Sequence, residues 1–249
     1  MSKQLINEGD SMTTDLVKTA KAELAAYQEP VGTGGEYDSS DFAIHYVRLI
    51  QASSEEVKDS VCKPGVFFST DGEQTEFIDF VPIHIQFTRD FYDADAGKAI
   101  CGSHDRKTGN PRDLPTFKAQ GIDLADGETL LCASCPFFES TGKVSCRKTY
   151  LLTCYDLTKE APFMYRVRGS AMGVFKNRIV GAVAMGRSVP WARSFQMTST
   201  KKSSGGNSWF SPELQPTEIF SEERCAEWKA YASGIAAPQG DFDATLPFE

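Results

Sequence analysis

The chain has 249 residues, with 26 Lys and Arg against 34 Asp and Glu, so its formal net charge is −8. Hydrophobic residues make up 41% and charged residues 24%, which excludes a fully disordered chain, a collagen-like repeat and a coiled coil. No apolar stretch approaches the roughly 20 residues that a membrane span needs. No apolar block of a secretory signal follows the first residues, MSKQLINEGD. These features predict a cytoplasmic protein with no membrane partner.

The first third of the chain predicts one helix and several strands. Residues 13–27 place Leu16, Val17, Ala20 and Leu24 on one helical face, and the glycines that follow predict a flexible link, so residues 1–35 form a peripheral segment. Aromatic and β-branched residues predict strands at 42–50, 66–69 and 77–87, with a turn at residues 71–72.

Residues 98–146 are different, because they are rich in Gly, Pro, Asp and Lys and show no periodicity. A loop of this length is unexpected inside a compact domain unless something else holds it. After it the pattern predicts strands at 149–155 and 162–167, a helix from about Ser170 that its hydroxyl caps, a hairpin around residues 201–207, and a helix at 221–232.

Many short strands, few helices and long loops predict a β-rich α+β fold. We favour a small barrel with insertions for residues 36–235, although the sequence does not separate a barrel from a sandwich. Residues 236–249 carry the Gly, Pro and Ala content of a disordered tail.

Seven cysteines and no export signal argue against a disulfide framework. Four of them, Cys101, Cys132, Cys135 and Cys146, lie in the stretch that lacks periodicity and have spacings of 30, 2 and 10 residues between them. Four thiolates suit tetrahedral Zn²⁺, and a closed site of this kind is structural. The sequence therefore predicts a zinc-pinned loop at residues 98–148.

Other interpretations of the cysteines remain open. His104 or Cys154 could replace one of the four zinc ligands. The thiols could also be buried core residues. A redox pair at Cys132 and Cys135 is a further alternative, although such a pair normally opens a helix in a βαβ unit, whereas Pro136 follows here.

Charge is segregated along the chain. Residues 143–210 contain twelve basic residues and two acids, whereas the rest of the chain contains 14 basic residues and 32 acids. Aromatic residues are interleaved with these cations. Single-stranded nucleic acid needs cations for its phosphates and flat rings for its splayed bases, so this half predicts a single-strand groove.

The predicted nucleic-acid contacts are the cations and rings of this basic half. They are Arg147, Lys148, Tyr165, Arg166, Arg168, Lys176, Arg178, Trp191, Arg193, Phe195, Lys201, Lys202 and Trp209. The alternative for any single ring is an ordinary place in the core. The sequence does not distinguish DNA from RNA.

The acidic tail predicts a second contact. Its carboxylates could compete with nucleic acid for the basic groove, or its apolar tip could anchor in a pocket on a partner protein. The predicted partner-binding residues are Asp241, Phe242, Asp243, Leu246, Pro247 and Phe248.

Two segments carry a family resemblance. The ending DFDATLPFE resembles the acidic tip of bacterial single-stranded DNA-binding proteins, in which aspartates precede Ile-Pro-Phe, although here Glu249 follows the Phe. The central part, CGSHD…LCASCPFF…GKVSCRKTYLL, is similar to phage-type zinc-containing single-stranded DNA-binding proteins. The resemblance covers about residues 98–215 and the tail. It implies an OB-like small β-barrel with a long zinc loop, and a tail that recruits replication or recombination proteins in the host cytoplasm.

The sequence predicts no enzyme, because it lacks a phosphate-cradling loop, a nucleophile elbow and a zinc-protease helix. Two other functions remain as alternatives to single-stranded DNA binding. One is a phage-encoded zinc-containing adaptor or transcription-associated factor that binds a protein. The other is a nuclease that uses Asp90 and Asp93 to hold a metal.

Overall fold

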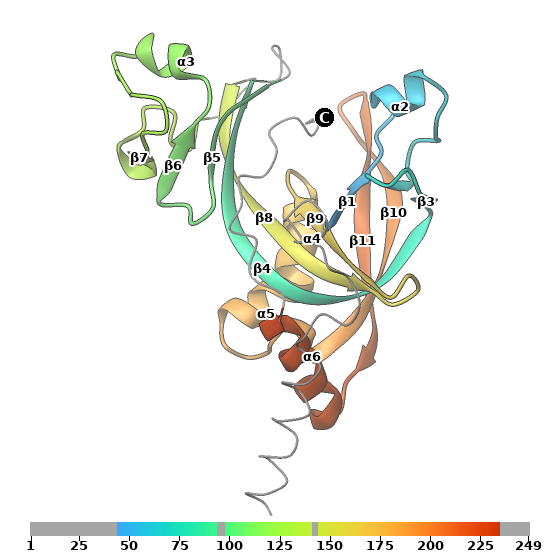
Figure 1. Ribbon diagram of the computed structural model, residues 1–249. Coiled ribbons are helices and arrows are strands. Elements are labelled where there is room, and N and C mark those ends of the chain that lie inside the picture. Colours follow the sequence, from blue (N-terminus) through green and yellow to red (C-terminus); the bar gives the residue numbers. More distant parts are fainter. Residues whose placement is uncertain (1–43, 94–97, 141–143, 235–249) are drawn as a thin grey trace, which may run out of the picture. The chain divides into compact units, whose positions relative to one another are not determined.

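The computed structural model describes residues 44–93, 98–140 and 144–234, and within them an eleven-stranded mixed sheet carries a few short helices (Figure 1). The predicted β-rich α+β fold is therefore confirmed. The predicted helix at 13–27 and the tail with its candidate contacts, Asp241 to Phe248, lie outside the described residues.

The strands are β1 (His45–Leu49), β2 (Phe67–Ser69), β3 (Gln74–Thr75), β4 (Phe77–Asp93), β5 (Lys98–Ser103), β6 (Thr108–Pro111), β7 (Leu130–Leu131), β8 (Val144–Asp156), β9 (Ala161–Val167), β10 (Arg193–Ser204) and β11 (Asn207–Ile219). The helices are α2 (Glu55–Lys58), α3 (Leu114–Lys118), α4 (Ala171–Phe175), α5 (Gly181–Ala184) and α6 (Glu222–Gly234). A π-helical turn, Lys176–Val180, joins α4 to α5.

The sheet is organised around the long strand β4, which curves strongly in Figure 1. The strand order is β3-β2-β1-β9-β8-β4-β5-β6-β7, and β10 also pairs with the first residues of β4 and carries β11 on its other side. Strands β1 and β9 run parallel, whereas β4 and β8 form an antiparallel ribbon along almost their whole length. Because β4 pairs with β10 at one end and β5 at the other, it joins the two parts of the sheet.

The sheet does not close into a barrel, so the predicted barrel is wrong in this respect. A gap, which we call the seam, separates β1 and β2 from β11, and side chains rather than a strand ladder bridge it. Gln51 Nε2 donates to the Phe210 carbonyl at 3.1 Å, and Gln51 Oε1 accepts from the Phe210 N–H at 2.8 Å. The Ser199 hydroxyl donates to the Gly65 carbonyl in the same place.

Two prolines explain why the seam stays open. The Phe210 backbone faces Gln51 and not β10, and backbone direction alternates along a strand, so positions 212 and 216 face the same free edge. Pro212 and Pro216 have no N–H to donate to another strand. The free edge of β11 is therefore protected against strand pairing.

The main core lies inside the curled part of the sheet. Eighteen buried residues from β1, β2, β4, β8–β11 and the α4–α5 helix form one cluster. The fully buried Phe80 ring packs edge-on against Phe163, with 6.1 Å between ring centroids, and at a tilt against Phe195, with 5.9 Å between centroids. Alternating apolar positions on β4, β8 and β10 supply this core, as strands with one buried face require.

Residues 98–140, which we call the cysteine region, contain regular structure that the sequence pattern did not predict. Strands β5, β6 and β7 extend the ladder beyond β4, and α3 adds the buried Phe117 to a small core with Phe91 and Ile100. These elements are two to six residues long, which is too short for a periodic pattern.

Arg106 fastens this region to the β4–β8 ribbon. Its Nε donates to the Thr88 carbonyl at 3.0 Å and its Nη2 donates to the Thr149 carbonyl at 2.6 Å. Its guanidinium also lies 5.0 Å from the Phe87 ring and 5.2 Å from the Tyr150 ring. One side chain thus holds the turn between β5 and β6 against both long strands.

The C-terminal elements follow the predictions closely. The predicted hairpin is confirmed as β10–β11, with Gly205 and Gly206 at positive φ in its turn. The predicted last helix is α6, where the Ser221 hydroxyl accepts from the Arg224 N–H at 3.3 Å. Ser170 does not cap α4 as predicted. Within the described ranges, no helix has the length and apolar character to cross a membrane.

Candidate functional site

A pocket of about 510 Å³ lies at the seam. Strands β1, β2, β9 and β11 and the first turn of α4 contribute to its walls. Among the described residues, its lining contains cations and rings but no carboxylate. The lining residues are Tyr46, Val47, Arg48, Leu49, Gln51, Ser54, Phe68, Thr70, Tyr165, Arg166, Arg168, Gly169, Ser170, Ala171, Trp209, Phe210 and Pro212.

Three arginines give the pocket its charge, and two of them have acidic partners outside the lining. Arg48 pairs with Glu56 of α2, and Arg166 Nη1 lies 3.3 Å from Asp90 Oδ2. Arg168 is exposed directly after β9, where the charge of Asp90 also acts on it, but no ion pair to it occurs within the part of the chain that the structure describes. The pocket and its partners therefore carry about one uncompensated positive charge.

Aromatic side chains occupy the walls beside these cations. The Arg48 guanidinium lies 5.8 Å from the centroid of the half-buried Phe68 ring. Trp209 Nε1 donates to the Ser170 hydroxyl at 3.1 Å, which holds the indole next to the start of α4. The half-exposed rings of Phe68 and Trp209 provide flat faces on which a planar ligand could stack.

Close packing shapes the wall formed by Phe210. A side chain at Gly65 would come within 2.5 Å of the Phe210 ring, and Gly65 has a φ of +91°. Only glycine satisfies both conditions without strain. The Phe210 ring and the Gln51 amide therefore form a fixed end of the pocket.

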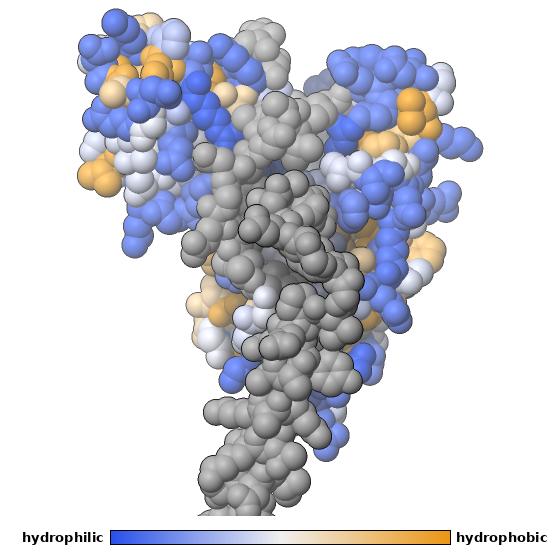
Figure 2. Space-filling model, in the orientation of Figure 1, coloured by the Kyte–Doolittle hydropathy of each residue, from blue (hydrophilic) through white to orange (hydrophobic). Residues whose placement is uncertain are grey.

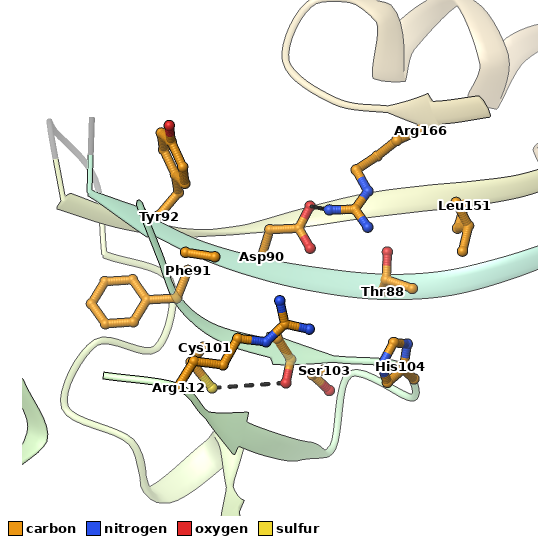
Figure 3. Close-up of a pocket in the computed structure, with 12 residues that line it drawn as sticks. Thr88, Asp90, Phe91, Tyr92, Cys101, Ser103, His104, Arg112, Leu151 and Arg166 are labelled. Atoms are coloured by element: carbon orange, nitrogen blue, oxygen red, sulfur yellow. Dashed lines mark hydrogen bonds and ion pairs between the residues drawn. The ribbon is translucent and has the colours of Figure 1, made fainter. Parts of the chain in front are cut away.

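Arg166 connects this pocket to a second, much smaller cavity of about 20 Å³ between β4 and the cysteine region. Figure 3 shows Asp90 and Arg166 pointing toward one another there. The Thr149 hydroxyl donates to Asp90 Oδ2 at 3.2 Å and also lies 2.7 Å from the Thr88 hydroxyl. Arg166 is thus held by a network in the wall that the two cavities share.

This network bears on the nuclease alternative. The Asp90 carboxylate, which that alternative assigns to a metal, interacts with the Arg166 guanidinium and the Thr149 hydroxyl. Asp93 lies three positions along β4, at its end. The arrangement gives Asp90 a structural role as the partner of Arg166.

Burial also alters the tyrosine beside Arg166. Burial raises the pKa of Tyr46 to about 12, although the nearby Arg166 guanidinium, through its charge and a hydrogen bond, acts in the opposite direction. The Tyr46 hydroxyl therefore keeps its proton at neutral pH and serves the pocket as a neutral polar group.

The four predicted zinc ligands are neighbours, but the zinc prediction is wrong. Cys101, Cys135 and Cys146 pack around the small core of the cysteine region, and Cys132 is buried beside them. Among the described residues, which include all four cysteines, no group of three or more His, Cys, Asp and Glu side chains is arranged to hold a metal ion. All seven cysteines of the chain are free thiols.

The physical reason is burial of the thiols and of the rings around them. Burial raises the pKa of Cys101 to about 12, and the other three cysteines add to the rise. Burial also raises the pKa values of Cys135 and Cys146. The zinc prediction assumed that this region could not stabilise itself by burial, but Phe91, Phe117 and their neighbours form a core there.

The two alternative zinc ligands also have other surroundings. Cys154 is fully buried in the main core, where burial raises its pKa well above the usual value. His104 lines the small cavity that Arg166 shares.

The predicted nucleic-acid contacts are only partly brought together. Arg166, Arg168 and Trp209 meet at the seam pocket, with Tyr165 behind them in the core. Phe195 is buried, and the half-buried Trp191 packs against a second cluster that contains Val81, Ile83 and Trp228, outside the pocket lining.

The remaining predicted cations lie on other surfaces. Lys148 pairs with Glu139, and Lys202 lies 3.9 Å from Glu213. The rest are Arg147 on β8, Lys176 and Arg178 on the π-helical turn, Arg193 at the start of β10, and Lys201 near the hairpin tip. The structure therefore brings four of the thirteen predicted residues together in the lining of the seam pocket and places the other nine elsewhere.

Sequence reasoning missed the half of the pocket that β1 and β2 supply. This part of the lining consists of Tyr46, Arg48 and Phe68. They lie in the acidic part of the chain, so the search for segments rich in basic residues did not select them. The alternation of ring, Val and cation in HYVRL, next to a second aromatic strand, is the only local signal.

Comparisons with protein-family models, with curated proteins and with solved structures found no match. Figure 2 shows hydrophilic residues predominating around α2. The seam pocket is the site from which a function can be argued.

Proposed function

We propose that this protein is a non-catalytic single-stranded DNA-binding protein that serves DNA replication or recombination. The observation that carries the proposal is the seam pocket, whose lining combines three arginines and several rings with no carboxylate. Phosphates need cations, and unstacked bases need flat faces, so a single strand matches both halves of this lining.

The shape of the pocket supports a single strand over a duplex. A duplex keeps its bases stacked inside, so it offers none of them to a recessed ring. Trp209 and Phe68 are half-buried in the walls of the pocket, where an unpaired base can reach them.

The same seam argues against a protein partner that adds a strand to the sheet, as an adaptor could. Pro212 and Pro216 remove two donors from the free edge of β11, and Gln51 occupies the backbone of Phe210. Strand addition relies on such main-chain groups. The edge is therefore poorly suited to that mode of recognition.

The test is binding of labelled oligothymidine and of a duplex, measured by fluorescence anisotropy over a range of NaCl concentrations. We expect tighter binding to the single strand, with an affinity that falls linearly on a log–log plot as salt rises. Absence of binding, or binding that does not respond to salt, would contradict the proposal.

A matched pair of variants locates the site. Arg168→Gln removes a cation that lines the pocket and has no ion pair among the described residues. Arg187→Gln removes an exposed cation that follows α5 and lies outside the pocket lining. We expect the first variant to weaken oligothymidine binding several-fold and the second to leave it unchanged. Equal effects of the two variants would remove the pocket from the proposal.

A further inference from the structure

We infer that the seam pocket holds one nucleotide of the bound strand, with its base stacked on Trp209 and one phosphodiester beside Arg168. This inference rests on the proposed function and assigns the pocket a ligand of defined size.

The charge of the pocket matches one phosphodiester. Glu56 compensates Arg48 and Asp90 compensates Arg166, which leaves Arg168 as the remaining cation of the described lining. A phosphodiester carries one negative charge, so a single one neutralises the site. A second phosphate would need to disrupt one of the two ion pairs.

The ring and the cation lie at the same corner. Arg168 precedes Ser170 by two residues, and Ser170 accepts the hydrogen bond from the Trp209 indole. The residue between them, Gly169, has a φ of +57°, which turns the chain from β9 into α4. Arg168 and Trp209 therefore both line the pocket near the start of α4, as stacking of a base on the ring and contact of its phosphate with the cation require.

Several polar groups that line the pocket already form hydrogen bonds with neighbouring residues of the protein. The Gln51 amide is bonded to the Phe210 backbone, the Ser54 hydroxyl accepts from the Gln51 N–H, and the Thr70 hydroxyl accepts from the Tyr46 N–H. Few directed donors remain to read the edge of a base. The pocket therefore recognises a base by its face, which tolerates any sequence.

The test uses thymidine 5′-monophosphate as the probe and tryptophan fluorescence as the readout. The nucleotide should quench the emission of the wild-type protein and should displace labelled oligothymidine. In Trp209→Phe the nucleotide should still displace the oligonucleotide, but the quenching should disappear, because Trp228 is buried and Trp191 packs against the cluster around it, outside the pocket lining.

The outcomes separate this inference from the proposed function. Oligothymidine binding without any quenching or competition by the mononucleotide would overturn the one-nucleotide pocket and leave single-strand binding intact. Failure of oligothymidine itself to bind would overturn both. Trp209→Leu, which removes the ring, should weaken oligothymidine binding about 10-fold, and an unchanged affinity would also overturn the inference.

The salt dependence tests the phosphate separately. Loss of one phosphate contact lowers the slope of log affinity against log salt by about 0.7 for a single strand. We expect this change in Arg168→Gln and no change in Arg187→Gln. An unaltered slope in Arg168→Gln would show that no phosphate lies beside Arg168.

Discussion

The curled sheet around the seam and the cysteine region are built in opposite ways. The curled sheet encloses a cluster of eighteen buried residues, whereas the cysteine region has three buried residues at its core, Phe91, Ile100 and Phe117. The first is made of long strands with alternating apolar residues. The second is made of short elements that pack around a few rings and thiols.

This difference shows that a stretch without periodicity can still form a core. A few large aromatic side chains bury much apolar area each, so irregular spacing does not prevent burial. The Phe91 ring packs on Phe137 at 4.5 Å and on Phe117 at 6.2 Å between centroids. The stability of the cysteine region should therefore depend on a few individual rings. The stability of the curled sheet should depend on its whole core of buried residues.

The largest effect is expected from Phe80→Ala in the curled sheet. Phe80 is fully buried between Phe163 and Phe195, so its removal should cost about 3–5 kcal/mol of unfolding free energy. Urea denaturation measures the loss. The matched control is Phe77→Ala on the same strand, where the side chain is 48% exposed and the cost should be about 0.5 kcal/mol or less. Similar losses in the two variants would contradict the assigned core.

Phe117→Ala should produce the next largest effect, but a local one. Phe117 is fully buried in the cysteine region, and its removal should cost about 3 kcal/mol there. Hydrogen exchange should accelerate in β5–β7, while the β10–β11 hairpin keeps its protection. The control Leu131→Ala removes a side chain that is 63% exposed in the same region. Uniform loss of protection over both regions would show that they unfold together.

Alkaline pH should affect the cysteine region through its thiols. The pKa of Cys101 is raised to about 12 in the folded protein from a usual value near 9, so the folded state holds the proton more tightly than the unfolded state. The resulting stability is complete below about pH 9 and is lost as pH rises toward 12, by up to about 1.4 kcal/mol per pH unit. The melting temperature of the wild type should fall faster above pH 9 than that of Cys101→Ala.

The control for the alkaline experiment is Cys225→Ala, which removes a thiol on α6. This variant should follow the wild type through the same pH range. A steeper fall in Cys101→Ala than in the wild type would contradict the buried thiol cluster.

The smallest effects should come from two glycines and should have opposite signs. A side chain at Gly109 would lie 3.0 Å from Cys101 Sγ and 3.7 Å from Cys132 Sγ, so Gly109→Ala should destabilise by about 1 kcal/mol. Gly173 lies inside α4 with nothing within 4 Å of such a side chain, so Gly173→Ala should stabilise by about 0.5–1 kcal/mol. Thermal melts of the two variants check the signs, and a stabilised Gly109→Ala would contradict the close thiol packing.

The site itself was predictable only in part. Arg166, Arg168 and Trp209 were accessible to sequence reasoning because they lie in the basic half of the chain. Arg48 and Phe68 were not, since they reach the same pocket from strands about 100 residues or more earlier. Sheet pairing brings them together, when β1 runs parallel to β9 with Val47 opposite Tyr165.

The zinc prediction was wrong for a related reason. The cysteine spacing correctly suggested that the four thiols are neighbours, but spacing does not specify whether thiols are charged. Phe91 and Phe117 form a core beside the thiols, and burial raises the pKa values of Cys101, Cys135 and Cys146; that environment exists only in the folded protein.

The sequence by itself determined the β-rich class, the β10–β11 hairpin and the last helix, because alternation, turn glycines and helical spacing are local properties of the chain. Tertiary structure alone decided that the sheet stays open at the seam, that the cysteine region builds its own core, and which arginines face one pocket. These features depend on contacts between residues far apart along the chain, and local patterns carry no information about such contacts.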